Sequence, residues 1–449
     1  MSAVRPLVLL ELNEVNCDFV RRYAARGELP AFARLLDQCG LAETVSESEY
    51  EKLEPWIQWV SAHTGLSFEQ HRVFRLGDIV QRDLVQIWER LEANGIVVAA
   101  VSPINGANRT RRSPFFLPDP WTRTPVSGSW VLRQLSAGLA QAVGENAQRR
   151  MTPATFARLL LAMVTHFRAS TAGELARCAL SAPSRPWRAT MFLDRFLADV
   201  FVRQWRRHRP GFASLFLNGA AHIQHHYMFS SAVYAGPHRN PEWYIPRSAD
   251  PLLEIYSLYD RILADVLRLP GEPRVMLATG LHQDPHPVEQ YYYRLRDHAA
   301  FLHRLAAPFA SVQGLMSRDF TVQCHSAMDA GRCGVVLRGL RAPDGSPLFS
   351  VDDRGTDLFA MLIYPREIGR GFIFSRDGRP QWDLADDVAF VALKNGEHNG
   401  IGYFADTGAH PPPPGTRFAV TEIFARVCAA LGVNEDMATG VSADRPQAA

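Results

Sequence analysis

The chain has 449 residues, 47% of them hydrophobic, and its 48 lysine and arginine residues nearly balance its 46 aspartates and glutamates. This length provides a large buried core, and the balanced charge excludes the strongly basic surface typical of proteins that bind nucleic acid or acidic membranes. Six cysteines are spread widely without a CxxC pair, which excludes a zinc knuckle and a dense disulfide framework. We therefore expect a reduced, cytoplasmic protein.

The N-terminal part of the chain alternates apolar strands with helical segments. The apolar segment 7–12 predicts a short buried strand, and it is too short for a signal peptide or a membrane span. Helices are expected over 16–38, with a break at Pro30, and over 78–94. The continuous apolar segment 96–101 predicts the next strand. This alternation favours an α/β fold with a doubly wound, mostly parallel sheet and helices on both faces.

The remainder of the chain adds two larger features to this sheet. From about 134 to 208 the periodicity is almost entirely helical, which predicts a helical insertion over one face of the sheet. Short strands and Asp-Gly turns between about 310 and 385 predict a small mixed β subdomain within one α/β domain over 1–432. The sequence leaves open whether the insertion forms a lid or the surface of a homodimer. The other expected elements are strands 213–217, 274–278 and 388–393, helices 252–268 and 418–431, and a flexible tail over 433–449.

Polar side chains follow the C-terminal ends of the predicted strands. Glu11, Asn13 and Glu14 come at or just past the end of strand 7–12, and each of the other main strands also leads into a polar segment. In open α/β sheets, ligands and metals bind at this edge because the carboxyl ends of parallel strands meet there. We therefore expect all five strands, including 388–393, to contribute to one functional site.

Histidines are concentrated after strand 213–217. His222, His225 and His226 lie within five residues. His222 and His226 are four residues apart, which places them on one helical face, where two imidazoles could share a metal ion. His398 follows the last strand in a Gly-rich turn at the same expected edge. The alternative is that these histidines are hydrogen-bonded structural or surface residues.

Glu54 lies beside two tryptophans, Trp56 and Trp59. A carboxylate packed against tryptophan rings has a raised pKa, which suits a general acid or base, although simple core packing explains the same cluster. Signatures of serine hydrolases (GxSxG) and of phosphate-binding loops (Walker A, GxGxxG) are missing from the sequence. Alternative nucleophiles just upstream are Ser46, Ser48 and Tyr50.

The order of these parts resembles the alkaline phosphatase superfamily, in particular its type I phosphodiesterase and nucleotide pyrophosphatase branch. Residues 27–35 match the family pattern G-x-L-P-x-x-x-x-L, Thr64-Gly65 match the Thr-Gly that follows the nucleophile loop, and His71 lies where the family has a histidine. The resemblance covers roughly residues 7–110 and 210–405. It implies an alkaline-phosphatase-like fold and metal-dependent chemistry on a small anionic ester.

Several family positions are altered in this chain. The metal-binding aspartate after the first strand falls on Asn13, and the hydroxyl nucleophile falls near Glu54. The motif Asp-x-x-x-His becomes Asn218-x-x-x-His222, and the Asp-His-Gly position reads Thr-Gly-Leu over 279–281, with His282 as the only substitute nearby. The resemblance therefore implies one divalent ion, or none, rather than two zinc sites. The implied ligands of one ion are Glu14 or Asn13, Asn218, His222 or His226, and His398.

Our leading hypothesis is a metal-dependent hydrolase or transferase that acts on a phosphate- or sulfate-type ester of a small molecule in a biosynthetic pathway. Zinc, manganese or magnesium would act as Lewis acid and template, and Glu54 would act as general base or nucleophile. The expected substrate-binding residues are Asn105, Asn108, Arg109 and His282.

Two other classes of function stay open. The first is a degenerate, non-catalytic protein that binds a phosphorylated ligand or a partner enzyme, as the altered family positions suggest. The second is a metal enzyme of another class, a lyase or a non-haem iron oxygenase, because two histidines and one carboxylate with open positions suit iron.

Overall fold

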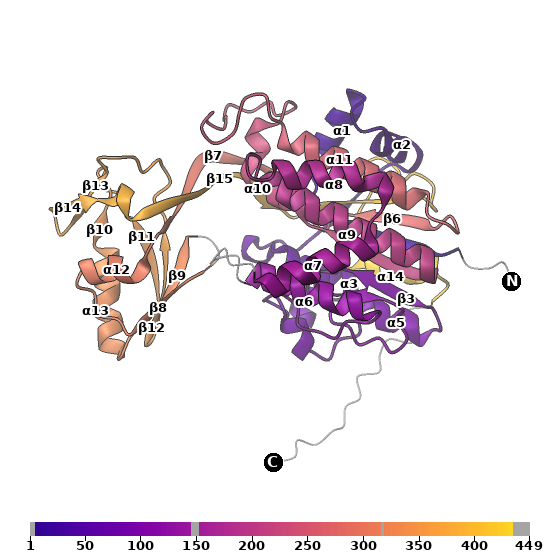
Figure 1. Ribbon diagram of the computed structural model, residues 1–449, viewed down its shortest axis with the longest axis horizontal. Helices are drawn as coiled ribbons and strands as arrows, with labels where there is room; N and C mark the ends of the chain where they lie inside the picture. The colour runs from indigo at the N-terminus through magenta and orange to yellow at the C-terminus, as the bar shows by residue number, and fades with distance from the viewer. Residues whose placement is uncertain (1–4, 145–151, 316–317, 434–449) are drawn as a thin grey trace, which may run out of the picture.

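The computed structural model describes residues 5–144, 152–315 and 318–433. Within these residues, an eight-stranded sheet forms the centre of the larger of two lobes (Figure 1). Its strands, in spatial order, are β17 (Arg417–Ala419), β2 (Ala42–Val45), β16 (Ile401–Asp406), β6 (Arg274–Ala278), β1 (Leu7–Leu12), β5 (Phe212–Leu217), β3 (Val98–Val101) and β4 (Phe116–Leu117).

Strand β1 lies at the centre of the sheet between two parallel neighbours. It pairs with β5 from Leu7↔Phe212 to Leu12↔Leu217 and with β6 on its other edge, and β3 continues the parallel order beyond β5. All six residues of β1 are buried, as expected for a parallel strand covered on both faces. Only β16 runs antiparallel to its neighbours among the paired strands of this sheet. The predicted fold class, a mostly parallel α/β sheet, is confirmed.

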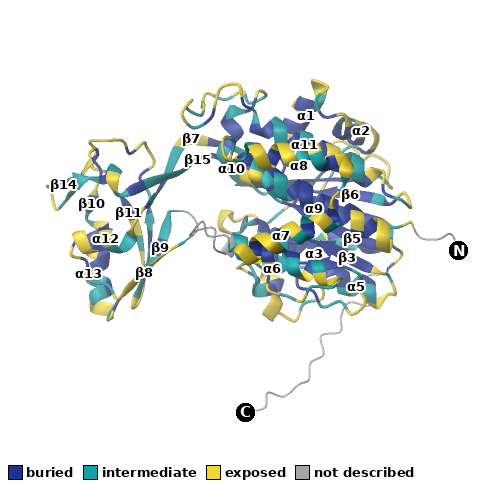
Figure 2. Cartoon of the chain, viewed as in Figure 1, coloured by how far each residue is buried: buried dark blue, intermediate teal, exposed yellow. Residues whose placement is uncertain are grey.

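Helices cover both faces of the sheet. Alternate side chains of β1 point to opposite faces, and helices bury each set in a separate core. Val8, Leu10 and Leu12 belong to one core and Leu7 and Leu9 to another, and Figure 2 shows the buried strands between outer helices that expose their far sides. The helices of the first core are α1 (Cys17–Ala25), α2 (Pro30–Cys39), α9 (Trp187–His208), α10 (Gly219–Tyr227) and α11 (Pro251–Leu267). Those of the second are α3 (Pro55–Thr64), α5 (Ile87–Ala93) and α14 (Glu422–Ala430).

The described part of the expected helical insertion contains four α-helices, which pack on the first of these cores. They are α6 (Trp130–Gly144), α7 (Pro153–His166), α8 (Ala172–Ser181) and α9. Thr152 caps α7 by accepting a hydrogen bond from the backbone N–H of Thr155, and Pro153 occupies the first helical position. None of the helices in the described ranges combines the length and apolar character that crossing a bilayer requires. All six cysteines are buried, and none of them forms a disulfide.

A second, smaller lobe has its own hydrophobic core, which includes Phe301, Phe320 and Leu337. It occupies the stretch where we expect a small β subdomain, but it begins earlier, with α12 (His298–Arg304). A four-stranded sheet is formed by β11 (Phe349–Arg354), β12 (Asp357–Leu362), β9 (Asp319–Gln323) and β8 (Ser311–Gly314). A three-stranded sheet is formed by β10 (Leu340–Arg341), β13 (Ile373–Arg376) and β14 (Arg379–Asp383), and α13 (Ala327–Arg338) completes the lobe.

A two-stranded antiparallel ribbon, β7 (His282–Leu295) with β15 (Val388–Asn399), joins the two lobes (Figure 1). This corrects two expectations. The segment 279–286, which Pro285 and Pro287 lead us to interpret as a stiff loop from the sequence, is strand from His282 on. The strand expected over 388–393 runs on to Asn399 outside the main sheet. Each strand of a two-stranded ribbon has a free edge, so the missing N–H groups of Pro285 and Pro287 do not prevent pairing.

Two helix boundaries also differ from the sequence expectation. The helix expected over 78–94 is a single 3₁₀ turn, Asp78–Gln81, followed by α5, which begins where Gln86 and Glu89 form a capping box. The last helix begins at Glu422 rather than near 418. Apart from Val433, the expected flexible tail lies outside the described residues.

Candidate metal centre

Glu14 lies in the tight turn that follows β1. Its backbone adopts φ 59°, a left-handed conformation that non-glycine residues rarely adopt and that costs on the order of 1–3 kcal/mol. The turn is fixed from two sides, because the N–H of Glu14 donates to the carbonyl of Thr279 at 3.1 Å and its carbonyl accepts from Nε2 of Gln224 at 2.6 Å. This turn directs a buried carboxylate toward the carboxyl edge of the sheet.

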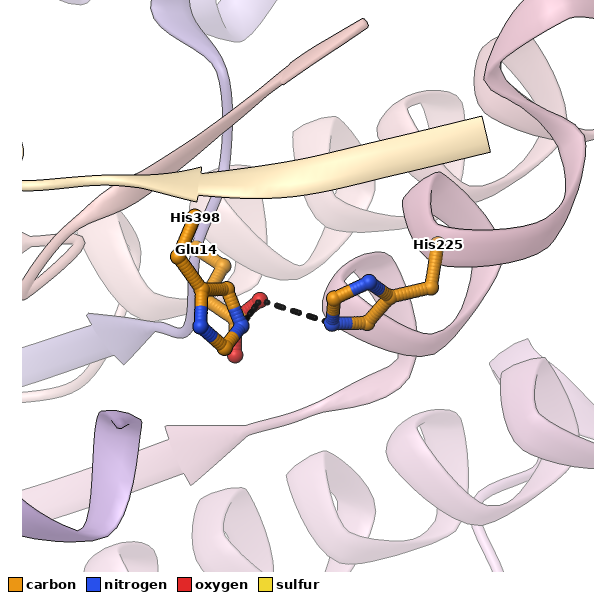
Figure 3. Close-up of side chains that lie close together, drawn as sticks. All are labelled: Glu14, His225 and His398. Carbon is orange, nitrogen blue, oxygen red and sulfur yellow. Dashed lines mark ion pairs between the residues drawn. The ribbon is translucent and has the colours of Figure 1, made fainter. Parts of the chain in front are cut away.

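Two histidines approach this carboxylate from elements far away in the sequence. Nε2 of His225, on α10, lies 3.4 Å from Oε2 of Glu14, and Nε2 of His398, on β15, lies 3.2 Å from the same oxygen. The three ligand atoms all lie within 4.8 Å of one another. Figure 3 shows the three side chains converging from β1, α10 and β15. We call Glu14, His225 and His398 the metal triad.

The orientation of both imidazoles is favourable for binding a metal ion. Nδ1 of His225 lies 3.3 Å from the carbonyl oxygen of Gly396, which only accepts, so Nδ1 carries the proton and the lone pair of Nε2 faces Glu14. Metal-binding histidines commonly donate their second N–H in this way. Nε2 of His398 is buried and has no hydrogen-bond partner among the described residues. Each imidazole therefore offers a nitrogen to the same point.

Without a metal ion, positive charge on the imidazoles favours the ionised form of Glu14; a bound metal ion would supply that positive charge while the imidazoles are neutral. Burial alone would raise the pKa of Glu14, but His398 and His225 outweigh it and hold the pKa well below its usual range. Burial lowers the pKa of His398, but Glu14 and Glu54 together outweigh it and give a net rise. The carboxylate is therefore ionised. One carboxylate with two imidazoles is a ligand set of catalytic zinc sites, which keep a further position open, and also of non-haem iron sites.

Asn13 and Asn218, which were predicted as ligands, hold Glu14 in place instead of joining the triad. Nδ2 of Asn13 donates to Oε1 of Glu14 at 2.9 Å and to Oδ1 of Asn218 at 2.7 Å. Oδ1 of Asn13 accepts from Nε1 of Trp59 at 2.8 Å. Gln283 donates to the other carboxylate oxygen. The side-chain oxygens of Asn13 and Asn218 each already accept a hydrogen bond. Asn13 contacts the Glu14 carboxylate directly, and Asn218 contacts it only through Asn13.

His222 and His226, also predicted as ligands, lie close to each other but outside the triad. Their ring centroids are 4.9 Å apart, as the helical spacing requires. Burial, followed by the charges of His222 and His225, holds the pKa of His226 well below its usual value. His225 was not predicted as a ligand, because spacing shows which residues share a helical face and not which face points toward Glu14.

Glu54 is the predicted catalytic residue that the structure brings to the triad. It occupies the N-cap position of α3, and its carboxylate makes no capping hydrogen bond. Burial raises its pKa; His398 opposes this rise, Glu14 adds to it and His225 opposes it. Glu54 therefore lies within electrostatic range of all three triad residues. A carboxylate with a raised pKa beside a metal site suits proton transfer.

The predicted substrate-binding residues are engaged in other contacts. Nδ2 of Asn105 donates to the carbonyls of Trp56 and Arg75, at 3.0 and 3.2 Å. Nδ2 of Asn108 donates to the carbonyl of Pro125 at 2.8 Å. These amides fix the loops after β3.

Arg109 and His282 are engaged in the same manner. The Arg109 guanidinium donates to the carbonyls of Leu84 and Ile79, at 2.6 and 2.8 Å, and to that of Arg82. One ring nitrogen of His282 contacts the carbonyl of Ile401, and the other lies 3.1 Å from Oδ1 of Asp284. Glu11 likewise lies away from the triad, with Oε1 2.9 Å from Nε2 of His63 beneath α3.

Comparisons with known proteins give structural similarity only. No protein-family model matches the chain, and no curated protein sequence matches it. Phosphonoacetate hydrolase from Sinorhizobium meliloti 1021, solved with phosphonoacetate, is similar at 12% identity over 95% of this chain and 96% of that one, with a TM-score of 0.44. Murine ectonucleotide pyrophosphatase/phosphodiesterase 5 is similar at 10% identity over 96% of both chains, with a TM-score of 0.42.

The alkaline phosphatase PafA is similar at 12% identity over 97% of both chains, with a TM-score of 0.46. Identities and TM-scores of this size transfer no residue's role to this chain.

Proposed function

We propose that this protein is a metal-dependent hydrolase or transferase that acts on a phosphate- or sulfate-type ester of a small molecule. The observation that carries the proposal is the metal triad: a buried, ionised carboxylate with two imidazole Nε2 atoms at 3.2 and 3.4 Å from one of its oxygens. Three protein ligands leave room for a substrate oxygen or a water molecule, which is the arrangement of catalytic rather than structural sites.

Glu54 is the residue that we assign to proton transfer. A divalent ion held by the triad would polarise an ester oxygen and lower the pKa of a bound water molecule. Glu54 replaces the hydroxyl nucleophile expected from the family resemblance, and its raised pKa suits accepting a proton from the attacking water or alcohol. Asn13 and Gln283 keep the Glu14 carboxylate oriented for its ligand role.

The test is an activity screen on metal-free and reconstituted protein. Metal removed by chelation is replaced by zinc, manganese or magnesium, and hydrolysis of aryl phosphate, aryl phosphodiester and aryl sulfate esters is followed. We expect turnover of at least one ester type by the loaded protein and none by the metal-free protein. Full activity of the metal-free protein on its best ester, or inactivity of every loaded form, would contradict the proposal.

A second candidate is a non-haem iron oxygenase, and the same triad favours it. Two histidines and one carboxylate, with open positions, form the facial ligand set of such iron sites. Anaerobic reconstitution with iron(II), followed by exposure to nitric oxide and electron paramagnetic resonance, tests this candidate. A stoichiometric iron–nitrosyl signal together with substrate-dependent oxygen consumption would favour the oxygenase; ester hydrolysis by the zinc or manganese form would favour the hydrolase.

A further inference from the structure

Lysine is rare in this chain, which contains only Lys52 and Lys394. Lys52 is held in two ion pairs, with Glu49 at 2.7 Å and Glu69 at 3.1 Å. Lys394 lies half-buried on β15, shortly before His398 in the sequence. Its ammonium group makes no ion pair or hydrogen bond with any residue that the structure describes. A half-buried charge without a partner is unfavourable. The position of Lys394 therefore favours binding of an anionic ligand group.

Arg318 lies beside Lys394 and has an unpartnered nitrogen of its own. Its guanidinium carbon lies 4.2 Å from the centroid of the Tyr292 ring, and its Nη1 is buried without a hydrogen-bond partner in the described ranges. Tyr292 pairs with Ala392 across the ribbon, and Lys394 is two residues further along β15. Tyr292 and Lys394 therefore lie on the same face of the ribbon, and Tyr292 supports Arg318 above that face.

The charge of Arg318 acts on Lys394, and nearby acidic groups offset the burial of the two cations only in part. Burial lowers the pKa of Lys394; Glu397 partly opposes this effect, and the charge of Arg318 adds to it. The pKa of Arg318 is also lowered, chiefly by burial. An anionic oxygen between the two groups would accept hydrogen bonds from both and remove their repulsion.

The cation pair and the metal triad share strand β15, on which Lys394 precedes His398 by four residues. The charge of Lys394 adds to burial in opposing protonation of His398. Anions bound at the cation pair and at the metal triad would thus contact the same strand, β15.

We propose that Lys394 and Arg318 form a second anion-binding subsite, so that the substrate carries a second anionic group, a carboxylate or a phosphate, besides the group bound at the metal. This inference rests on the proposed function for the group at the metal. It narrows the substrate class from anionic esters in general to small molecules with two anionic groups.

The first experiment is calorimetric titration of the zinc-loaded protein with non-hydrolysable probes. The probes are methylphosphonate, methylenediphosphonate, ethylenediphosphonate and phosphonopropionate, which vary the second group and its distance from the first. We expect at least one two-group probe to bind about tenfold more tightly than methylphosphonate, and the better second group identifies carboxylate or phosphate. Equal affinity for all four probes would overturn the inference.

Variants of the two cations test whether this preference belongs to them. Lys394→Met and Arg318→Met are expected to lose the preference and to keep the affinity for methylphosphonate, whereas Lys394→Arg retains it. Arg332→Met is the matched control, because Arg332 is an exposed arginine on α13 of the same lobe. Near-ultraviolet circular dichroism verifies that each variant is folded. Retention of the preference in both methionine variants would contradict the assignment.

A second readout separates failure of the subsite from failure of the metal site. Reductive methylation with ¹³C labels only Lys52, Lys394 and the N-terminal amine, and the Lys394→Arg spectrum assigns the Lys394 signal. Inorganic pyrophosphate is expected to shift that signal even in metal-free protein. A shift in protein that binds no metal would leave the subsite standing and overturn the proposed function. No shift in protein that binds metal normally would overturn the subsite alone.

Discussion

Replacing Asn13 by alanine tests whether this residue positions Glu14 or binds the metal itself. Asn13 makes three side-chain hydrogen bonds, to Glu14 at 2.9 Å, to Asn218 at 2.7 Å and from Trp59 at 2.8 Å. Trp59 is completely buried and Glu14 nearly so. The alanine variant leaves these partner groups unpaired, and each buried polar group without a partner costs about 1–3 kcal/mol.

We therefore expect Asn13→Ala to lower the free energy of unfolding by about 3 kcal/mol, measured by urea denaturation of metal-free protein. Metal affinity, measured by competition with a chromophoric chelator, is expected to fall about 10–100-fold, which is the usual effect of losing a residue that orients a ligand. Asn218→Ala is the matched control, because it removes only the bond from Asn13 and leaves Glu14 and Trp59 paired with Asn13.

Two results would refute this reasoning. If Asn13→Ala has the stability and metal affinity of the wild type, the hydrogen-bond network does not position Glu14. If it empties the site as completely as His398→Ala does, Asn13 is a ligand, as the sequence motif predicted, and its positioning role is wrong.

Three further predictions follow from the same structure. Glu54→Gln is expected to lower kcat about 10²–10⁴-fold, the usual contribution of a general base, while elemental analysis finds the wild-type metal content; unchanged turnover would remove Glu54 from the mechanism. Burial raises the pKa of Asp194 to about 6 from 3.8, so its folded form binds a proton more tightly than the unfolded chain does. The stabilisation from this group is therefore present below about pH 4 and lost by about pH 6. The expected loss is on the order of 3 kcal/mol in the free energy of unfolding measured with urea, and the Asp194→Asn variant should not show it. Chelation of the metal is expected to lower the melting temperature of the wild type and to leave that of His225→Ala unchanged, as scanning calorimetry would show.

Much of the larger lobe could be predicted because its signals are local. The apolar segment 7–12 and the strand 274–278 correspond to β1 and β6 with the same bounds. Pro30 separates α1 from α2, as expected of a proline that is favourable only in the first helical turn. Continuous apolar segments between amphipathic helices are sufficient to indicate a buried parallel sheet.

The ribbon could not be predicted, because its signals depend on tertiary structure. Pro285 and Pro287 made 279–286 look like a loop, yet each strand of a two-stranded ribbon has a free edge that tolerates proline. The long β15 follows from pairing with β7, and this pairing depends on the position of the second lobe. His398 was therefore expected in a turn of the main sheet, whereas it lies on the ribbon.

The candidate site was predicted in part. Glu14 and His398 do come together from distant positions at the end of β1 and the end of the ribbon, and Glu54 lies within electrostatic range of both. His225 was missed in favour of His222 and His226, since the packing of α10 decides which histidine faces Glu14. Arg109 looked like an anion-binding residue, but backbone carbonyls of a neighbouring loop occupy its guanidinium, and no local pattern indicates such a contact.

The central claim is that Glu14, His225 and His398 hold one metal ion, and elemental analysis of matched histidine variants tests it most directly. Wild-type protein and His222→Ala, His225→Ala and His398→Ala variants are purified in parallel and reconstituted with zinc. We predict about one zinc per chain in the wild type and in His222→Ala, and a strong loss in His225→Ala and His398→Ala. Loss of zinc in His222→Ala with retention in His225→Ala, or no zinc in the wild type, would contradict the metal triad.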